Sequence, residues 1–130
     1  MTKAEIKAAL SAYREAKPRL DEKLKELAEW EKRYQGNMPA CCAMPMRELI
    51  CQIQLEVEEI GHKRNQAIEL LNLLSSDFQK EVLRRKYFLG QGWRRIQREM
   101  SYSERSIYRA HNDGLKELCK LENEKEKSWQ

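Results

Sequence analysis

The residues with the clearest chemical potential are arginines in the last third of this 130-residue chain. Arg105 and Arg109 are four residues apart in a stretch with helical periodicity, so a helix places them on one face. A guanidinium group on such a face can donate to both acceptors of a guanine edge. The type and spacing of these residues therefore predict a surface that binds nucleic acid.

The charge around these arginines also favours a surface that binds nucleic acid. Residues 80–109 contain nine Lys and Arg against three acids, a net charge of +6, whereas the whole chain is only +4. Arg outnumbers Lys in this segment, and the planar guanidinium suits phosphate and guanine better than an ammonium does. A solvated cationic helix would have the same charge, so the interpretation depends on the elements that present the arginines.

Two short helices are predicted there, Trp93–Met100 and residues 104–118, joined by a turn at residues 100–103. Ser103 is placed to cap the second helix, and Ile107, Leu115 and Leu118 give it one apolar face. Its opposite face is polar and carries Arg105, Ser106, Tyr108, Arg109 and Asn112. This is the plan of a helix-turn-helix, whose second helix enters the major groove.

A further helix, residues 77–88, is predicted immediately before this pair. Ser75 and Ser76 offer N-terminal caps, and we expect Gly90 to end the helix in a left-handed conformation.

The first half of the chain predicts two long amphipathic helices with a coiled-coil seam. Apolar residues recur at alternating intervals of three and four over residues 3–34 and again over residues 50–74. The pattern breaks between Gln35 and Pro45, and Pro18 predicts either a kink near Lys17 or a helix that starts at Pro18. Two such helices can fold back into an antiparallel hairpin or dimerise with a second chain.

The predicted fold class is therefore all-α, a long helical coiled-coil hairpin followed by a helix-turn-helix domain. The expected domains are residues 1–74 for the hairpin, 75–120 for the DNA-binding part and 121–130 for a flexible tail. No apolar stretch is long enough to cross a membrane and no leader-like segment opens the chain, so we expect a cytoplasmic protein without membrane contact.

Metal binding and catalysis are not predicted. A zinc site would need Cys41, Cys42, Cys51 and His62, and adjacent cysteines rarely both face one ion, so we expect reduced thiols and no metal or cofactor. His62 and His111 lack a partner at catalytic spacing, and the Gly90-Gln91-Gly92 segment lacks a preceding strand and a third glycine. We therefore expect no enzymatic activity.

Residues 72–118, about a third of the chain, resemble the fourth region of bacterial sigma factors, which reads promoter DNA. The resemblance rests on residues 82–87, 93–96 and 103–107, with Leu115 and Leu118 closing the last helix. Ser101 stands where this turn commonly has Gly, Asn or Asp, and Gln97 stands where a small residue is usual. Combined with the N-terminal helices, the segment resembles small phage regulators of the RinA and ArpU kind, which are activators of late phage genes.

The resemblance implies a set of DNA contacts. The positions that contact bases would be Glu104, Arg105, Ser106, Tyr108 and Arg109. Arg94, Arg95 and Arg98 suit phosphate, which fixes register without reading sequence.

The predicted function is a sequence-specific DNA-binding regulator of transcription, encoded by a phage or prophage and acting in the cytoplasm of the bacterial host. Its expected partners are double-stranded DNA, RNA polymerase and further copies of itself through the N-terminal helices. The alternative is a coiled-coil structural or assembly protein, such as a DNA-packaging subunit of the small-terminase kind. In such a subunit we expect the DNA-binding part to precede the oligomerising helices, the reverse of the order found here.

Overall fold

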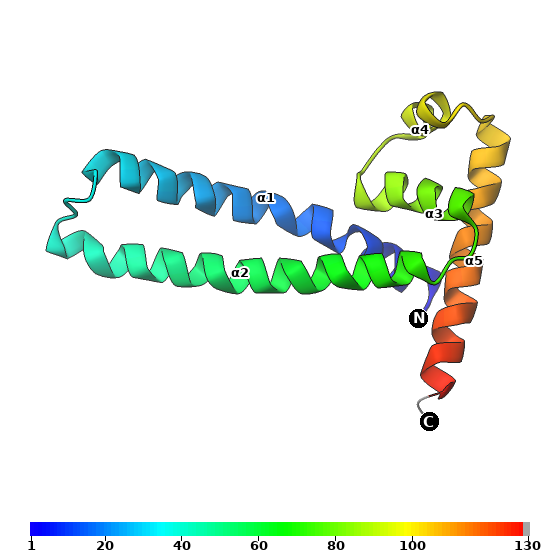
Figure 1. Ribbon diagram of the computed structural model, residues 1–130, viewed down its shortest axis with the longest axis horizontal. Coiled ribbons are helices and arrows are strands. Elements are labelled where there is room, and N and C mark those ends of the chain that lie inside the picture. The colour runs from blue at the N-terminus through cyan, green and yellow to red at the C-terminus, as the bar shows by residue number, and fades with distance from the viewer. Residues whose placement is uncertain (129–130) are drawn as a thin grey trace. The chain divides into compact units, whose positions relative to one another are not determined.

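The structure is a computed structural model that describes residues 1–128. Over this range it is helical and has no strand, which confirms the all-α prediction. The helices in chain order are α1 (Lys3–Tyr34), α2 (Ala40–Asn72), α3 (Asp77–Leu83), the π-helix η1 (Arg84–Phe88), α4 (Trp93–Met100) and α5 (Glu104–Ser128) (Figure 1). The helix predicted over residues 77–88 is thus an α-helix that becomes a π-helix. Helix α5 continues to Ser128 through the segment predicted as a tail, and residues 129–130 of that segment lie outside the described part.

The chain divides into two compact units. One unit consists of Glu15–His62, and the other combines Met1–Arg14 with the chain from Lys63 onward. Helices α1 and α2 each contribute to both units. The predicted domain division after residue 74 stays a prediction.

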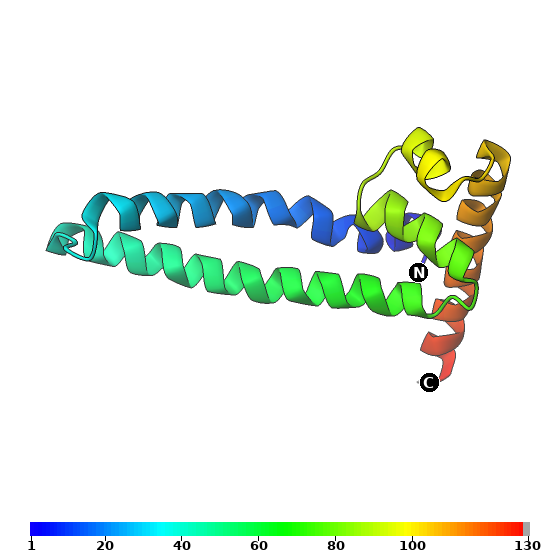
Figure 2. The same cartoon turned by 45° about the horizontal axis from the view of Figure 1, so that its top comes forward.

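In the unit Glu15–His62, the segments of α1 and α2 lie side by side and run in opposite directions (Figure 1, Figure 2). The chain reverses at Gln35 and Gly36, whose φ angles of 44° and 86° are left-handed. Leu49, Ile53 and Ile60 of α2 are buried here. An ion pair of 2.6 Å between Lys23 Nζ and Glu56 Oε1 links the two helices.

Both prolines of these helices lie inside them. The break predicted between Gln35 and Pro45 is shorter than expected, because α2 begins at Ala40 and includes Pro45. Pro45 lies in the second turn, where its ring meets only the short piece of helix before it. Helix α1 runs through Pro18, so the alternative that a separate helix begins there is wrong. Pro18 has no backbone N–H, so one helical hydrogen bond is lost there, a local cost that the rest of the 32-residue helix outweighs.

The second unit has a core that joins the start of α1, the end of α2, α3 and α5. Its buried members are Ile6, Leu10, Ala67, Leu70, Leu71, Leu74, Leu83, Leu115 and Leu118. Gly114 lets α5 approach α3 closely, since a Cβ at this position would lie 3.0 Å from Cδ1 of Leu83. The Arg14 Nε–H donates to the Tyr87 carbonyl over 3.1 Å and ties α1 to η1. These contacts fix α5, which presents part of the candidate site, and α3, against which α5 packs.

None of the helices in the described part of the chain has an apolar stretch that could cross a membrane.

Candidate nucleic-acid interface

The turn between α4 and α5 has a defined geometry. Ser101 ends α4 with φ 58° and ψ 38°, a left-handed conformation that costs a residue with a Cβ about 1 kcal/mol. Ser103 then caps α5, because the Ser106 amide donates to Ser103 Oγ over 3.3 Å. The predicted cap at Ser103 and the start of the helix at Glu104 are both confirmed.

A small apolar cluster holds α4 and α5 together. Val82 of α3, Ile96 of α4, and Ile107 and Ala110 of α5 are buried in it. Phe78, Trp93 and Met100 pack around this cluster. Since these residues occupy one side of α4 and of α5, the polar side of each helix is turned away from the cluster.

The predicted base-contacting residues lie on that polar side of α5. Glu104, Arg105 and Arg109 are exposed, and Ser106 is half-buried. The Ser103 hydroxyl donates to Ser106 Oγ over 3.0 Å, which holds the Ser106 side chain against the turn. Tyr108 is 37% exposed, and its ring lies against that of Trp93 with the centroids 4.5 Å apart. The structure thus brings all five candidates onto the first two turns of one helix.

The predicted backbone-contacting residues, Arg94, Arg95 and Arg98, are exposed on α4. Arg95 Nε donates to Glu99 Oε1 over 2.9 Å, one turn further along the helix. This hydrogen bond lowers the pKa of Glu99. Glu99 is therefore ionised, and it orients the Arg95 guanidinium at the surface.

A chain of charges continues from Glu99 to the end of α3. Arg85 bridges Glu99 and Glu81, and Arg84 also bonds to Glu81 through Nε and Nη2. The hydrogen bonds from Arg84 are the main cause of the lowered pKa of Glu81. One of the nine cations of this basic segment, Arg85, thus links η1 to α4, while Arg84 bonds within its own helical segment. Sequence reasoning missed this role, because Arg85 and Glu99 are 14 residues apart.

An aromatic cluster supports the base of the polar surface. The Lys86 ammonium lies 4.5 Å from the centre of the Trp93 ring, and the His111 ring meets Trp93 edge-on at 4.9 Å. His111 is only 7% exposed, so its side chain belongs to the interior. Its Nε2 lies 2.6 Å from the Tyr87 hydroxyl and its Nδ1 lies 3.0 Å from Asn112 Oδ1.

These partners fix the protonation of His111. Burial lowers its pKa and raises that of Tyr87. The Tyr87 hydroxyl therefore stays protonated and donates to Nε2, while Nδ1–H donates to Asn112. Tyr87, His111 and Asn112 thus form a neutral, hydrogen-bonded group that packs against Trp93.

Comparisons with protein-family models, curated proteins and solved structures found no match to this chain.

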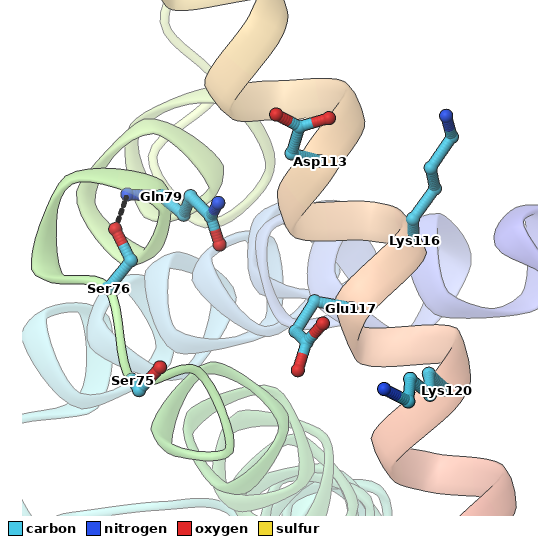
Figure 3. A pocket seen from close by; sticks show the side chains of 7 residues that line it. All are labelled: Ser75, Ser76, Gln79, Asp113, Lys116, Glu117 and Lys120. Atoms are coloured by element: carbon cyan, nitrogen blue, oxygen red, sulfur yellow. Dashed lines mark hydrogen bonds between the residues drawn. The ribbon is translucent and has the colours of Figure 1, made fainter.

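An open hollow of about 510 Å³ lies beside this surface, between the start of α3 and α5 (Figure 3). Its lining residues are polar, namely Ser75, Ser76, Gln79, Asp113, Lys116, Glu117 and Lys120. Ser76 caps α3 by accepting from the Gln79 amide over 3.3 Å, so the predicted cap is confirmed and this hydroxyl is engaged. Two acids and two lysines of α5 line it, so the lining favours no charge of ligand. The exposed arginines of α4 and α5 are the better candidate for recognition.

Proposed function

We propose that this chain is a sequence-specific DNA-binding regulator of transcription, of the phage late-gene kind that its C-terminal segment resembles. In this proposal α4, the turn at Ser101 and α5 form a helix-turn-helix, and α5 is the recognition helix. The observation that supports it best is the division of α5 into two sides. Ile107 and Ala110 are buried, whereas Arg105, two residues before Ile107, and Arg109, one residue before Ala110, are exposed.

The exposed side chains have the chemistry for reading bases. Arg105 and Arg109 can each donate twice to guanine, Glu104 can accept from the amino group of cytosine, and Ser106 can do either. The Tyr108 ring packs against Trp93, which restricts its motion. Ordering this side chain on DNA therefore costs little conformational entropy. Arg94, Arg95 and Arg98 on α4 supply phosphate contacts that set the register.

The N-terminal helices have a separate part in the proposal. As a coiled-coil hairpin, α1 and α2 join copies of the chain or contact RNA polymerase. A dimer presents two recognition helices to half-sites on one face of the duplex, which raises affinity without any new contact.

Selection of bound duplexes from a random double-stranded pool, followed by salt titration of the winner, tests this function. We expect an enriched motif whose affinity is about 1,000-fold or more above that of random DNA, with steep salt dependence. Binding that depends on salt but enriches no motif would replace the regulator with an architectural DNA-binding protein. No binding would refute the DNA-binding role and leave the coiled-coil assembly role.

A further inference from the structure

The sulfur-containing side chains of this protein are concentrated in one short stretch. The chain has four cysteines and five methionines, and six of these nine residues fall within residues 38–51. They are Met38, Cys41, Cys42, Met44, Met46 and Cys51. The stretch covers the turn between α1 and α2 and the first turns of α2, all inside the unit Glu15–His62. The residues proposed to contact DNA all lie outside this stretch.

Two of the thiols are already side by side. Adjacent cysteines rarely both face one ion, but here the Sγ atoms of Cys41 and Cys42 lie only 3.8 Å apart, and both residues are free cysteines. Cys42 Sγ is also 3.7 Å from the Tyr34 hydroxyl, which holds this side chain toward the end of α1. Cys41 is exposed, so the pair is open to a ligand from solvent.

Thioethers lie within one helical turn of these thiols. Met44 follows Cys41 by three residues and Met46 follows Cys42 by four, spacings that place side chains on the same face of a helix. Met44 is 62% exposed, so its side chain is open to a ligand from solvent. The start of α2 therefore offers thiol and thioether donors together.

We propose that this segment binds a soft metal ion, Cu(I), through the thiolates of Cys41 and Cys42 with the Met44 thioether as an additional donor. Two sulfurs 3.8 Å apart can both lie about 2.3 Å from one ion, at an angle of about 110°. Soft sulfur donors, thioethers included, select Cu(I) over harder ions. Zinc would need further nitrogen, oxygen or thiolate ligands, and the described residues contain no group of three or more His, Cys, Asp or Glu arranged around a metal position.

Binding requires no redox step. Each thiol releases its proton to solvent as its S–Cu bond forms, and copper stays in the Cu(I) state.

The test is anaerobic titration of the reduced full-length chain with Cu(I) in competition with a chromophoric Cu(I) chelator. The wild type should withdraw about one ion per chain and develop a thiolate-to-copper absorption band in the ultraviolet. The double variant Cys41→Ser with Cys42→Ser should lose both signals. The Met44→Leu variant should bind more weakly, and an unchanged affinity would overturn the part assigned to the thioether.

The matched control is the double variant Cys51→Ser with Cys119→Ser, which removes the same number of thiols. Cys51 is ten residues beyond Cys41 and therefore about 15 Å further along α2, so this variant should retain the ion. Circular dichroism of every variant checks that the helices remain. A wild type that leaves all copper with the chelator, or an equal loss in both double variants, would overturn the proposal.

Discussion

Arg105 and Arg109 have the properties that a side chain needs in order to contact a base from a helix surface. Both are exposed, both follow the Ser103 cap within two turns, and neither is involved in the ion-pair chain formed by Arg84, Arg85 and Arg95. Arg95 is oriented by Glu99 and suits a phosphate at fixed position. The surface thus contains one arginine that an ion pair orients, Arg95, and two exposed arginines outside that ion-pair chain, Arg105 and Arg109.

The first prediction concerns Arg105. Replacement by alanine should weaken binding to the selected operator by about 1–3 kcal/mol and relax the preference at one base pair. Binding to random DNA should change little, because a base contact contributes little to the non-specific affinity. Affinities of the variant for single-base operator substitutions, measured by fluorescence anisotropy, check this.

Arg33→Ala is the matched control for Arg105, since Arg33 is an exposed arginine of α1 outside the basic segment. It should bind the operator like the wild type. An Arg105 variant that loses the same affinity on every sequence would reassign Arg105 to the phosphate backbone.

His111 gives a prediction about pH. Burial is the main cause that lowers its pKa from 6.5, and the cations Lys7 and Lys86 lower it further. The unfolded chain therefore binds a proton near pH 6.5 that the folded chain binds only at lower pH. Stability rises with pH wherever the unfolded state holds more protons, so the free energy of unfolding should fall as the pH drops below 6.5.

Urea unfolding at a series of pH values measures this effect. In the His111→Gln variant the dependence between about pH 5 and pH 7 should flatten, because few other groups titrate there. His62→Gln removes the other histidine, which is exposed on α2, and should retain the slope of the wild type. Equal slopes in the wild type and His111→Gln would contradict the assignment.

At the scale of elements, the turns are encoded locally. Ser103, Ser76 and Gly90 were each predicted from the sequence, and each has the predicted role. A cap or a left-handed terminator depends on a few neighbouring residues, so its signal is present in the sequence itself. Ser101 also adopts the left-handed conformation, although it is not Gly, Asn or Asp, the residues that usually occupy this turn position.

The contacts between elements were not predictable in the same way. The sequence assigned Ile6 and Leu10 to a coiled-coil seam, whereas they share a core with Leu115 and Leu118 of α5. Likewise the pairing of Tyr87 with His111 joins residues 24 positions apart. A hydrophobic period identifies the buried side of a helix but not its neighbour, so these pairings required the folded structure.

The conformation of Gly90 leads to a prediction about the stability of the fold. Its φ of 73° disfavours any Cβ, and a Cβ built there would lie 2.6 Å from Cδ of Arg14. This atom belongs to the flexible, exposed Arg14 side chain, which can move aside if it gives up its bond to the Tyr87 carbonyl, so the positive φ is the main cost. Gly90→Ala should therefore lower the free energy of unfolding by about 1–2 kcal/mol or more, measured by urea denaturation.

Gly61→Ala serves as the comparison, because it is the same substitution inside α2, where a Cβ meets nothing within 4 Å. It should raise the stability by about 0.5–1 kcal/mol, since alanine is the better helix former. A Gly90 variant as stable as the wild type would show that the loop accommodates a side chain.

In the molecule as a whole, positive charge is concentrated in one segment of the chain. The segment 80–109 has a net charge of +6 while the full chain has +4, so the remainder is net negative by two. DNA would attract the basic segment and repel the rest. This asymmetry agrees with the proposed division between a part that binds DNA and a part that joins proteins.

The apolar surface on α2 supports the final prediction. Ile50 and Val57 are 36% and 52% exposed, and their seven-residue spacing places them on one side of the helix. A second copy of the chain would bury such a stripe. The wild type should therefore sediment as an oligomer, and Val57→Asp should sediment as a monomer with unchanged helicity, because a carboxylate in an apolar interface is costly. Gln52→Asp, an exposed change elsewhere on α2, should leave the mass unaltered.

The same variant links assembly to DNA binding. A monomer engages one half-site at a time, so Val57→Asp should also bind a two-half-site operator about 100-fold more weakly, yet bind an isolated half-site as the wild type does. Equal losses on both DNAs would mean that the substitution damages the DNA-binding surface itself. An oligomer that survives the substitution would exclude the Ile50–Val57 side of α2 as the interface.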